Sequence, residues 1–421
     1  MRPAATLVVR NVAWLAVGEV VLKGALFIAG VLVARGLGPA AMGDFTVGYG
    51  AALVLMLFLN AGQVEVLIRE TAKRPSAVRE LHHEARRWQA AVALAAVPLA
   101  AGAALLVRQP SLRWTLLAFI PYAWLRCWLI TLGAAFKGLD RMEVEVGGRA
   151  AELVVALVLL VPLAWLGAPV WTTGVAFSIG AGAGVAVMAL QFRRLPGDER
   201  ERVTRGFLAR EGLSFVGLAM AAQVMFRSDT FLLAAFGVAR ADIGRYGVAS
   251  APVWGLFALA QLVSLALYPT LARAAASGSL RLSRVLALAA VGAGLGLALA
   301  AGLQIVRSPL VRLVFGPDYL PAVPLLGLLS WALPGACTGM LLGGAIAACG
   351  RQAWSLTLRA AQVALAVAGN IVAIPRWGAA GAAAVAVAMN SLSLAGAVGV
   401  AALAVTRPPR TGRAVFSEPE W

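Results

Sequence analysis

The chain has 421 residues, of which 61% are hydrophobic and 13% charged, and its mean hydropathy is +0.84. A soluble domain carries about a quarter charged residues, so this chain lacks the polar surface that would cover it in water. The composition excludes a soluble enzyme, a disordered chain and a secreted disulfide scaffold, and it indicates that the solvent is lipid.

The formal net charge of +17 raises the question of a nucleic-acid partner. The cations are spaced along the whole chain between apolar blocks, and no segment forms a basic domain. Lys and Arg accumulate in the cytoplasmic loops of membrane proteins. We therefore expect no nucleic-acid partner.

Neither a metal site nor a disulfide is indicated. Cys127, Cys337 and Cys349 all lie inside apolar stretches without a CxxC pair, which is typical of small buried hydrophobic residues. His82 and His83 stand in a charged segment and are expected to be a solvated surface pair. HExxH, P-loop and GxSxG motifs are absent, so we expect neither a cofactor nor an enzyme.

The apolar runs predict an all-α polytopic membrane protein with twelve transmembrane helices. The first is too long for a signal-peptide core and carries Glu19 and Lys23 in its middle, so it is expected to be retained. The predicted spans are 11–34, 42–68, 88–107, 114–136, 146–166, 169–192, 211–236, 243–271, 282–306, 319–348, 353–375 and 379–405.

The distribution of the 36 cations predicts the orientation. With a cytoplasmic N-terminus, the inner segments hold 24 cations, the outer segments hold eight, and four lie within the spans. This bias across short loops predicts a multi-pass protein of the cytoplasmic membrane with both termini inside.

The two halves of the chain resemble each other. LGPAAMGDF (Leu37–Phe45) is similar to FGVARADIGRY (Phe236–Tyr246), and RAAELVVALVLLVPLAWLG (Arg149–Gly167) is similar to RAAQVALAVAGNIVAIPRWG (Arg359–Gly378). The offsets are about 200 and 210 residues, which predicts two parallel six-helix lobes related by internal duplication. The expected division is an N-terminal lobe (1–195), a cytoplasmic linker (196–209) and a C-terminal lobe with a short tail (210–421).

Four segments carry a resemblance to a known family. They are ARGLGPAAMGDF after the first span, RSDTFLLAAFGVARADIGRYGVASAP (Arg227–Pro252), LVFGPDYLPAVPLL (Leu313–Leu326) and IPRWGAAGAA (Ile374–Ala383). They resemble the polysaccharide-biosynthesis, or Wzx-type oligosaccharide flippase, family of the multidrug/oligosaccharidyl-lipid/polysaccharide exporter superfamily. The resemblance implies a carrier that moves a polyprenyl-pyrophosphate-linked oligosaccharide, such as an O-antigen or lipopolysaccharide precursor, to the outer leaflet. A glycan polymerase or ligase is a candidate partner.

Ionisable residues inside the spans are the candidate substrate site, because each costs roughly 2.5–3.5 kcal/mol to insert at mid-bilayer. Glu19 and Lys23 are spaced i, i+4 on the first span. They form either a self-neutralising structural pair or a site in which Lys23 meets substrate phosphate and Glu19 tunes it. Both interpretations stay open.

The equivalent helix of the second lobe carries Gln223, Arg227 and Asp229. Arg227 follows Gln223 by one turn, whereas Asp229 lies about 200° around the helix from Arg227. Only one of these two charges can face a cleft between the lobes, and we favour Arg227.

Three further arginines complete the candidate set. Arg149 with Glu152, and Arg359 with Gln362, are spaced i, i+3 near the cytoplasmic ends of two repeat-related spans, where arginine also snorkels to the interface. Arg126 lies among Tyr122, Trp124 and Trp128 and is either a stacked structural cation or a substrate contact.

Two other functions remain open. An ion-coupled exporter of organic cations would require surplus carboxylates in the cleft, and this chain has more cations than anions in the middle of its spans. A membrane glycan polymerase or ligase would require catalytic groups on a sizeable outer loop, and every predicted outer loop is short. The flippase is therefore the leading hypothesis.

Overall fold

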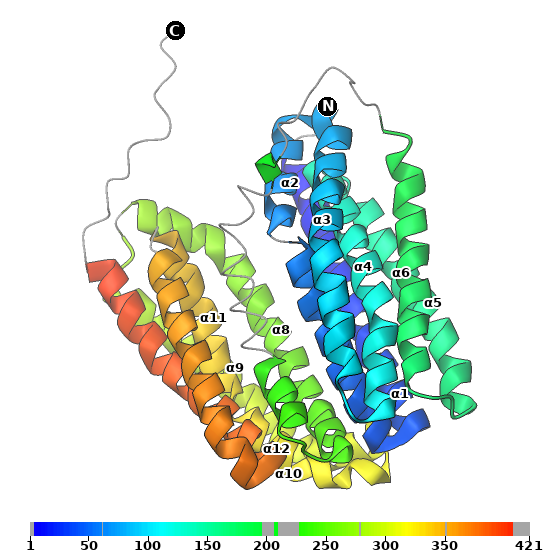
Figure 1. Ribbon diagram of the computed structural model, residues 1–421. Helices are drawn as coiled ribbons and strands as arrows, with labels where there is room; N and C mark the ends of the chain where they lie inside the picture. The colour runs from blue at the N-terminus through cyan, green and yellow to red at the C-terminus, as the bar shows by residue number, and fades with distance from the viewer. Residues whose placement is uncertain are drawn as a thin grey trace. The chain divides into compact units, whose positions relative to one another are not determined.

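The computed structural model describes residues 4–60, 62–195, 206–208, 227–277, 279–349 and 352–406. Every element in these ranges is helical (Figure 1). The elements are α1 (Ala4–Asn60), α2 (Gln63–Lys73), η1 (Pro75–Ala77), α3 (Val78–Leu105), α4 (Pro110–Gly138), α5 (Met142–Trp165), α6 (Trp171–Phe192), α8 (Arg240–Ala276), α9 (Leu282–Leu310), η2 (Val311–Phe315), η3 (Pro317–Ala322), α10 (Val323–Ser330), α11 (Leu333–Ala348) and α12 (Gln352–Thr406). Residues 227–235 are also helical.

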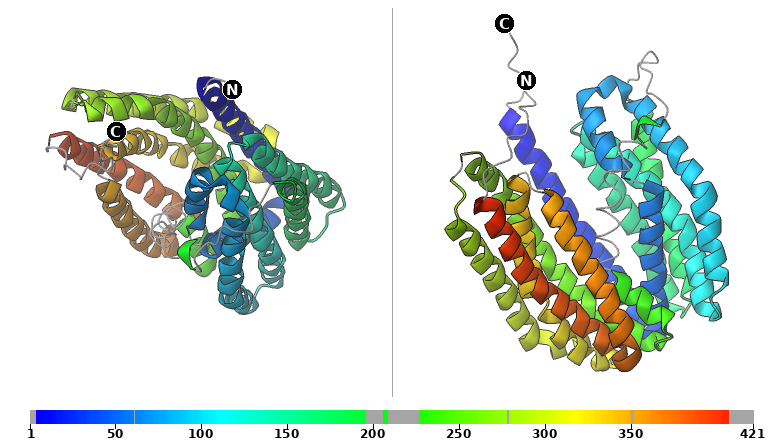
Figure 2. Two further views of the ribbon diagram at one scale, coloured as in Figure 1. Left: turned by 90° about the horizontal axis from the view of Figure 1, so that it is seen from above. Right: turned by 60° about the vertical axis from the view of Figure 1, so that its left-hand side comes forward.

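The longest two elements each contain a glycine break. In α1, Gly38 has φ +82° and is followed by Pro39, and in α12 Gly378 has φ +54° three residues after Pro375. A positive φ is accessible to glycine at little cost, so the chain changes direction without a loop. The two segments of α1, blue in Figure 2, run in different directions.

The all-α membrane fold is confirmed, whereas the number of spans stays a prediction. By length and hydropathy, eight of the described helices are able to cross a membrane, or nine if a bent pair is counted as one span. Two of the eight, Leu22–Asn60 and Thr357–Ala404, contain the glycine breaks and each correspond to two predicted spans. Most of the predicted span 211–236 lies outside the described residues.

The bent pair corresponds to the predicted span 319–348. Pro317–Ser330 and Leu333–Ala348 meet at an angle of 43°, because Pro334 in the first turn of α11 cannot donate to the preceding turn. The region predicted as a single helix is therefore broken between Ser330 and Leu333.

The charged segment 70–87, which joins two predicted spans, is largely helical. It contains the end of α2, η1 and the first turns of α3. His82 is 6% exposed, and its ring lies 4.7 Å from that of Phe192 in α6. The expectation of a solvated histidine pair is thus wrong for His82, while His83 is exposed.

The chain divides into two compact units. Unit 1 comprises Met1–Val248 and Leu310–Ala322, and unit 2 comprises Ala249–Pro309 and Val323–Trp421. This division follows contacts in space, and the predicted lobe boundaries at 195 and 210 stay a prediction because the linker lies almost wholly outside the described residues.

In unit 1, α4 packs against α6, α1, α2 and α3, and α5 packs against α6 and α1. Small residues permit the close approach, as is usual where lipid supplies no hydrophobic drive. A Cβ added to Gly174 would come within 2.8 Å of the Ala118 carbonyl carbon. A Cβ added to Gly184 would come within 2.6 Å of the Gly148 carbonyl oxygen.

In unit 2, α11 packs against α12, and α9 approaches α11 through glycines. A Cβ on Gly292 would come within 2.7 Å of Thr338 Cα, and Gly296 lies equally tightly against Pro334. Gly294 and Gly302 of the same helix face open space.

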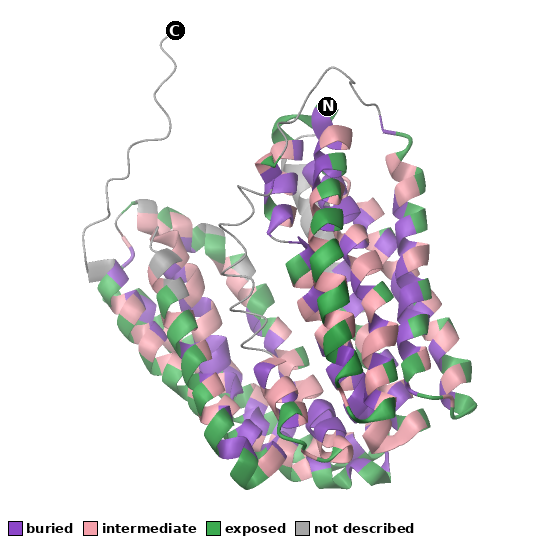
Figure 3. Ribbon diagram, viewed as in Figure 1, coloured by how far each residue is buried: buried purple, intermediate pink, exposed green. Residues whose placement is uncertain are grey.

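Many large apolar residues are exposed, and exposed positions, green in Figure 3, occur along the helices of both units. Leu94 of α3 is 81% exposed, Leu106 directly after α3 is 85% exposed, and Trp165 at the end of α5 is 86% exposed. Such a surface is stable only against hydrocarbon, which agrees with the composition.

Candidate functional site

An aromatic group at the centre of unit 1 supports the candidate site. Phe45 and Tyr49 of α1, Phe119 and Tyr122 of α4, and Phe177 of α6 have ring centroids 5.4–6.1 Å apart. Edge-on and offset contacts at such distances stabilise the packing beyond simple burial. The two tyrosine rings are therefore held on a rigid platform.

Arg227 lies over this platform. Its guanidinium carbon is 5.7 Å from the ring centre of Tyr49, within the range of a cation–π contact. A Cβ on Gly50 would come within 3.4 Å of the Arg227 side chain, so glycine at this position leaves space for the arginine. These contacts join residues 178 positions apart within unit 1.

Two ion-pair groups join α4 to α5. Arg126 of α4 donates from Nη1 to Glu152 Oε2 of α5, and the Glu152 side chain is completely buried. Glu145 Oε1 accepts from Lys137 Nζ at 3.1 Å and from Arg149 Nη1 at 3.3 Å. Arg126 and Arg149 are both close enough to Tyr122 to act on it electrostatically.

We call Tyr49, Tyr122, Arg126, Arg149 and Arg227 the tyrosine–arginine cluster. Its three arginines come from α4, α5 and the helix at 227–235, and Lys137 adds a fourth cation beside Glu145. These four cations face three carboxylates, those of Glu145, Glu152 and Asp229. The arrangement therefore offers guanidinium donors to an anion in a poorly solvated interior, where charge-assisted hydrogen bonds are strong.

Asp229 has a different role in the structure from Arg227. Its Oδ1 accepts from the backbone N–H of Thr230 at 2.6 Å, and its Oδ2 accepts from the hydroxyl of the buried Tyr246. It also acts electrostatically on Arg227. Its own hydrogen bonds tie the helix at 227–235 to the start of α8.

The remaining candidates are dispersed. Lys23 is exposed on α1, and the side chain of Glu19 and the whole of Gln223 lie outside the described residues. Arg359 is half-buried in unit 2, where its Nη2 would lie 3.5 Å from a Cβ on Gly343. The structure thus brings together Arg126, Arg149, Glu152 and Arg227.

Two expected pairings differ from the observed ones. Glu152 pairs with Arg126 of the neighbouring helix, and Arg149 reaches Glu145 one turn earlier, where an acidic residue at i−4 is the better partner. Trp124 and Trp128 are stacked by Arg86, whose guanidinium lies 4.6 and 4.5 Å from their rings, and not by Arg126.

Sequence analysis missed Arg86, Tyr49, Lys137 and Glu145. Arg86 lies in the charged segment between two predicted spans, and Tyr49 carries no charge that would single it out. Glu145 stands four residues before Arg149, and that i, i+4 spacing was the available signal.

The repeat-related turns meet inside unit 1. Gly43 lies against the carbonyl oxygen of Arg240, and Gly244 lies against that of Pro39, in each case so closely that a Cβ would overlap the oxygen. Pro39 and Arg240 each precede their glycine by four residues. The contact, which we call the glycine crossing, is therefore reciprocal between equivalent positions of the two halves.

Comparisons with known proteins agree with this architecture. Residues 8–275 match the family described as polysaccharide biosynthesis protein. No curated protein matches the chain in sequence.

Solved structures show the same fold at low identity. A multidrug resistance MATE family transporter of the MOP superfamily, in an inward-facing conformation, has a TM-score of 0.72 and 14% identity, covering 94% of this chain and 98% of the transporter. The lipid II flippase MurJ, in an inward closed conformation, has a TM-score of 0.71 and 12% identity, with coverage of 91% and 86%. The Vibrio cholerae MATE transporter VcmN in its bent form has a TM-score of 0.60 and 17% identity, with coverage of 95% and 98%.

Proposed function

Because the chain belongs to the polysaccharide biosynthesis protein family, we propose that it is a flippase for a polyprenyl-pyrophosphate-linked oligosaccharide. It would move this substrate across the cytoplasmic membrane by alternating access, for the synthesis of a surface polysaccharide. The family match agrees with the resemblance found in the sequence, and the structural neighbours include transporters and a lipid flippase.

The tyrosine–arginine cluster is the observation that carries the proposal. A pyrophosphate brings about two negative charges into the membrane, and unpaired charges there are very costly. Arg227 lies beside Tyr49, and Arg126 and Arg149 lie near Tyr122. The excess of cations over carboxylates in this group suits an anionic headgroup, and the aromatic platform suits the faces of sugar rings.

An exporter of organic cations is the second candidate, since two of the neighbours are MATE transporters. Such a site requires carboxylates that are free to meet a cation. One oxygen each of Glu145 and Glu152 already pairs with arginine or lysine, and Asp229 accepts from tyrosine and backbone donors, while Glu145 Oε2 and Glu152 Oε1 are buried beside these cations without a hydrogen-bond partner among the described residues. This pattern favours the anionic substrate.

The test is an export assay combined with mass spectrometry of lipids that co-purify with the protein. Arg227→Gln should abolish display of the surface glycan, and the lipid should no longer co-purify with the variant. Protein abundance should stay near normal. Arg227→Lys should retain part of the activity, because the charge is kept but the planar guanidinium is lost. Arg376→Gln, at an exposed arginine of unit 2, is the matched control and should export normally.

Lys23 provides a second arm of the test, because it occupies the first predicted span, the repeat equivalent of the helix that carries Arg227. We expect Lys23→Arg to be tolerated better than Lys23→Gln, since a point charge is what a phosphate requires. Normal export by both Lys23→Gln and Arg227→Gln would contradict the proposed site and would leave Arg126, Arg149 and Arg359 as the next candidates.

A further inference from the structure

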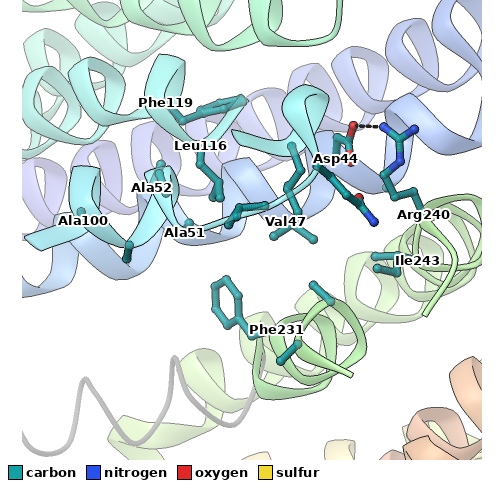
Figure 4. A pocket seen from close by; sticks show the side chains of 18 of the residues that line it. Asp44, Val47, Ala51, Ala52, Ala100, Leu116, Phe119, Phe231, Arg240 and Ile243 are labelled. Atoms are coloured by element: carbon teal, nitrogen blue, oxygen red, sulfur yellow. Dashed lines mark hydrogen bonds and ion pairs between the residues drawn. The ribbon is translucent and has the colours of Figure 1, made fainter. Parts of the chain in front are cut away.

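A cavity of about 750 Å³ lies in unit 1, outside the tyrosine–arginine cluster. Its walls come from the second segment of α1, the end of α3, the first half of α4 and residues 231–243. Figure 4 shows Phe231 pointing into it opposite Val47 and Ala51, with Asp44 and Arg240 joined at one end. Most of the lining side chains are apolar, chiefly alanine, leucine, valine and phenylalanine.

The cavity has one polar end and one apolar end. Along α1 the lining runs from Asp44 to Leu55, which is roughly 17 Å of helix at 1.5 Å per residue. Arg240 and Ser111 both bond to Asp44, and the lining residues Arg108 and Gln109 directly precede Ser111's helical turn, three and two residues before it. A ligand that fills this space must therefore be amphipathic, with a slender apolar part.

The polar end contains a buried carboxylate with one oxygen that lacks a hydrogen-bond donor among the described residues. Asp44 is 1% exposed, and its Oδ2 accepts from Arg240 Nη1 at 2.7 Å and from Ser111 Oγ at 2.6 Å. Its Oδ1 has no hydrogen-bond partner among the described residues. A buried carboxylate oxygen in this state demands a donor, and a ligand hydroxyl or ammonium would supply one.

The charges at this end favour an anion. Arg108 and Arg240 oppose the single carboxylate of Asp44, and Arg108 is exposed at the rim. One phosphate group would leave the polar end neutral, and guanidinium groups bind phosphate oxygens well.

The size of the cavity and its surroundings favour a membrane lipid. At roughly 30 Å³ for a water-sized group, the volume holds on the order of 25 such groups, which suits one fatty acyl chain and is far too small for a polyprenyl tail. Leu105 at the end of α3 and the following Leu106 are 57% and 85% exposed, so this wall of the cavity borders hydrocarbon.

We propose that this cavity binds one acyl chain of an anionic phospholipid whose headgroup carries hydroxyl groups, as in phosphatidylglycerol. The phosphate lies between Arg108 and Arg240, and a headgroup hydroxyl donates to Asp44 Oδ1. The chain then packs between α1, α3 and α4 on one side and Phe231 on the other, so the bound lipid stabilises the contact between these walls. This binding does not depend on which molecule the protein transports.

The experiment measures lipid binding to the purified protein by native mass spectrometry and by the shift in Tm. Phosphatidylglycerol should leave one retained lipid per chain and raise Tm by several degrees, as a ligand of the folded state does, whereas phosphatidylcholine should have little effect. Ala103→Trp fills the cavity from α3 and should abolish the phosphatidylglycerol effect. Ala95→Trp, on the same helix but outside the lining, should retain it.

The charge is tested separately. Arg108→Gln should weaken phosphatidylglycerol binding about tenfold, the effect of losing one charge-assisted hydrogen bond, and Arg312→Gln, at an exposed arginine outside the cavity, should not. An equal response to both lipids, or full retention by Ala103→Trp, would overturn the proposal. Binding of a polyprenyl phosphate that Ala103→Trp abolishes, without competition from phosphatidylglycerol, would also overturn it and would assign the cavity to the substrate.

Discussion

Arg126 and Glu152 form an ion pair in which each residue depends on the other. The Glu152 side chain has no exposed surface, and that of Arg126 is 17% exposed. Removal of one partner from a buried pair leaves an uncompensated charge, which is more costly than the pair itself is favourable. The pair is therefore vulnerable to single substitutions even though its net contribution to stability is small.

We expect Arg126→Gln to destabilise the protein by about 3–5 kcal/mol, and the double variant R126Q/E152Q to recover most of that loss. Thermal unfolding of the purified variants measures both effects. If the double variant is as unstable as Arg126→Gln alone, the stranded carboxylate is not the cause of the instability. Normal stability of the double variant with abolished export would assign Arg126 to substrate handling.

At the scale of elements, the glycine crossing brings the turn after the first segment of α1 against the start of α8. Gly43 and Gly244 each face the backbone of the other segment. The two segments therefore meet backbone to backbone at these glycines. Ala40 and Ala241 hold equivalent positions in the two turns, three residues before these glycines.

Cysteines at Ala40 and Ala241 should therefore cross-link with short reagents, in a background without Cys127, Cys337 and Cys349. The cross-link should inhibit export, because alternating access requires these turns to separate on one side of the membrane. Gel mobility and surface glycan display provide the two measurements, and each single cysteine variant is a control. Efficient cross-linking with full export would argue against alternating access.

At the scale of the whole molecule, the cation distribution predicts the topology. Reporter fusions after His82, near Gly197 and after Arg410 should all be cytoplasmic, and a fusion near Ala241 should be external, because 24 cations fall on one side and eight on the other. An external signal at Gly197 would contradict the two parallel lobes, since six helices would no longer return the chain to the same side.

The sequence predicted the all-α membrane fold because hydropathy depends only on composition along the chain. It did not predict helicity in 70–87, because that segment is amphipathic: Leu81, His82 and Ala85 are buried while Arg87 is exposed. A search for continuous apolar runs passes over such a pattern.

The site was predictable in residue type but not in partners. Mid-span charges single out Arg126, Glu152 and Arg227, since each needs compensation in lipid, and the structure places these three in one cluster. Their contacts lie 26 and 178 positions away in the sequence, whereas spacing along one helix detects only neighbours within a turn. Tyr49 could not be identified from the sequence for the same reason, because its ring contacts come from α4 and α6.

The glycine crossing also has a genetic consequence. Most tight contacts can be rescued after mutation by a smaller residue on the opposite side, but here the opposite side is the carbonyl oxygen of Pro39 or Arg240, which every amino acid possesses. No second-site change can create room for a Cβ at Gly43 or Gly244. In a deep mutational scan selected for surface glycan, both codons should therefore tolerate glycine alone, without suppressors at the partner position, whereas Gly255 of α8, which faces open space, should accept many residues.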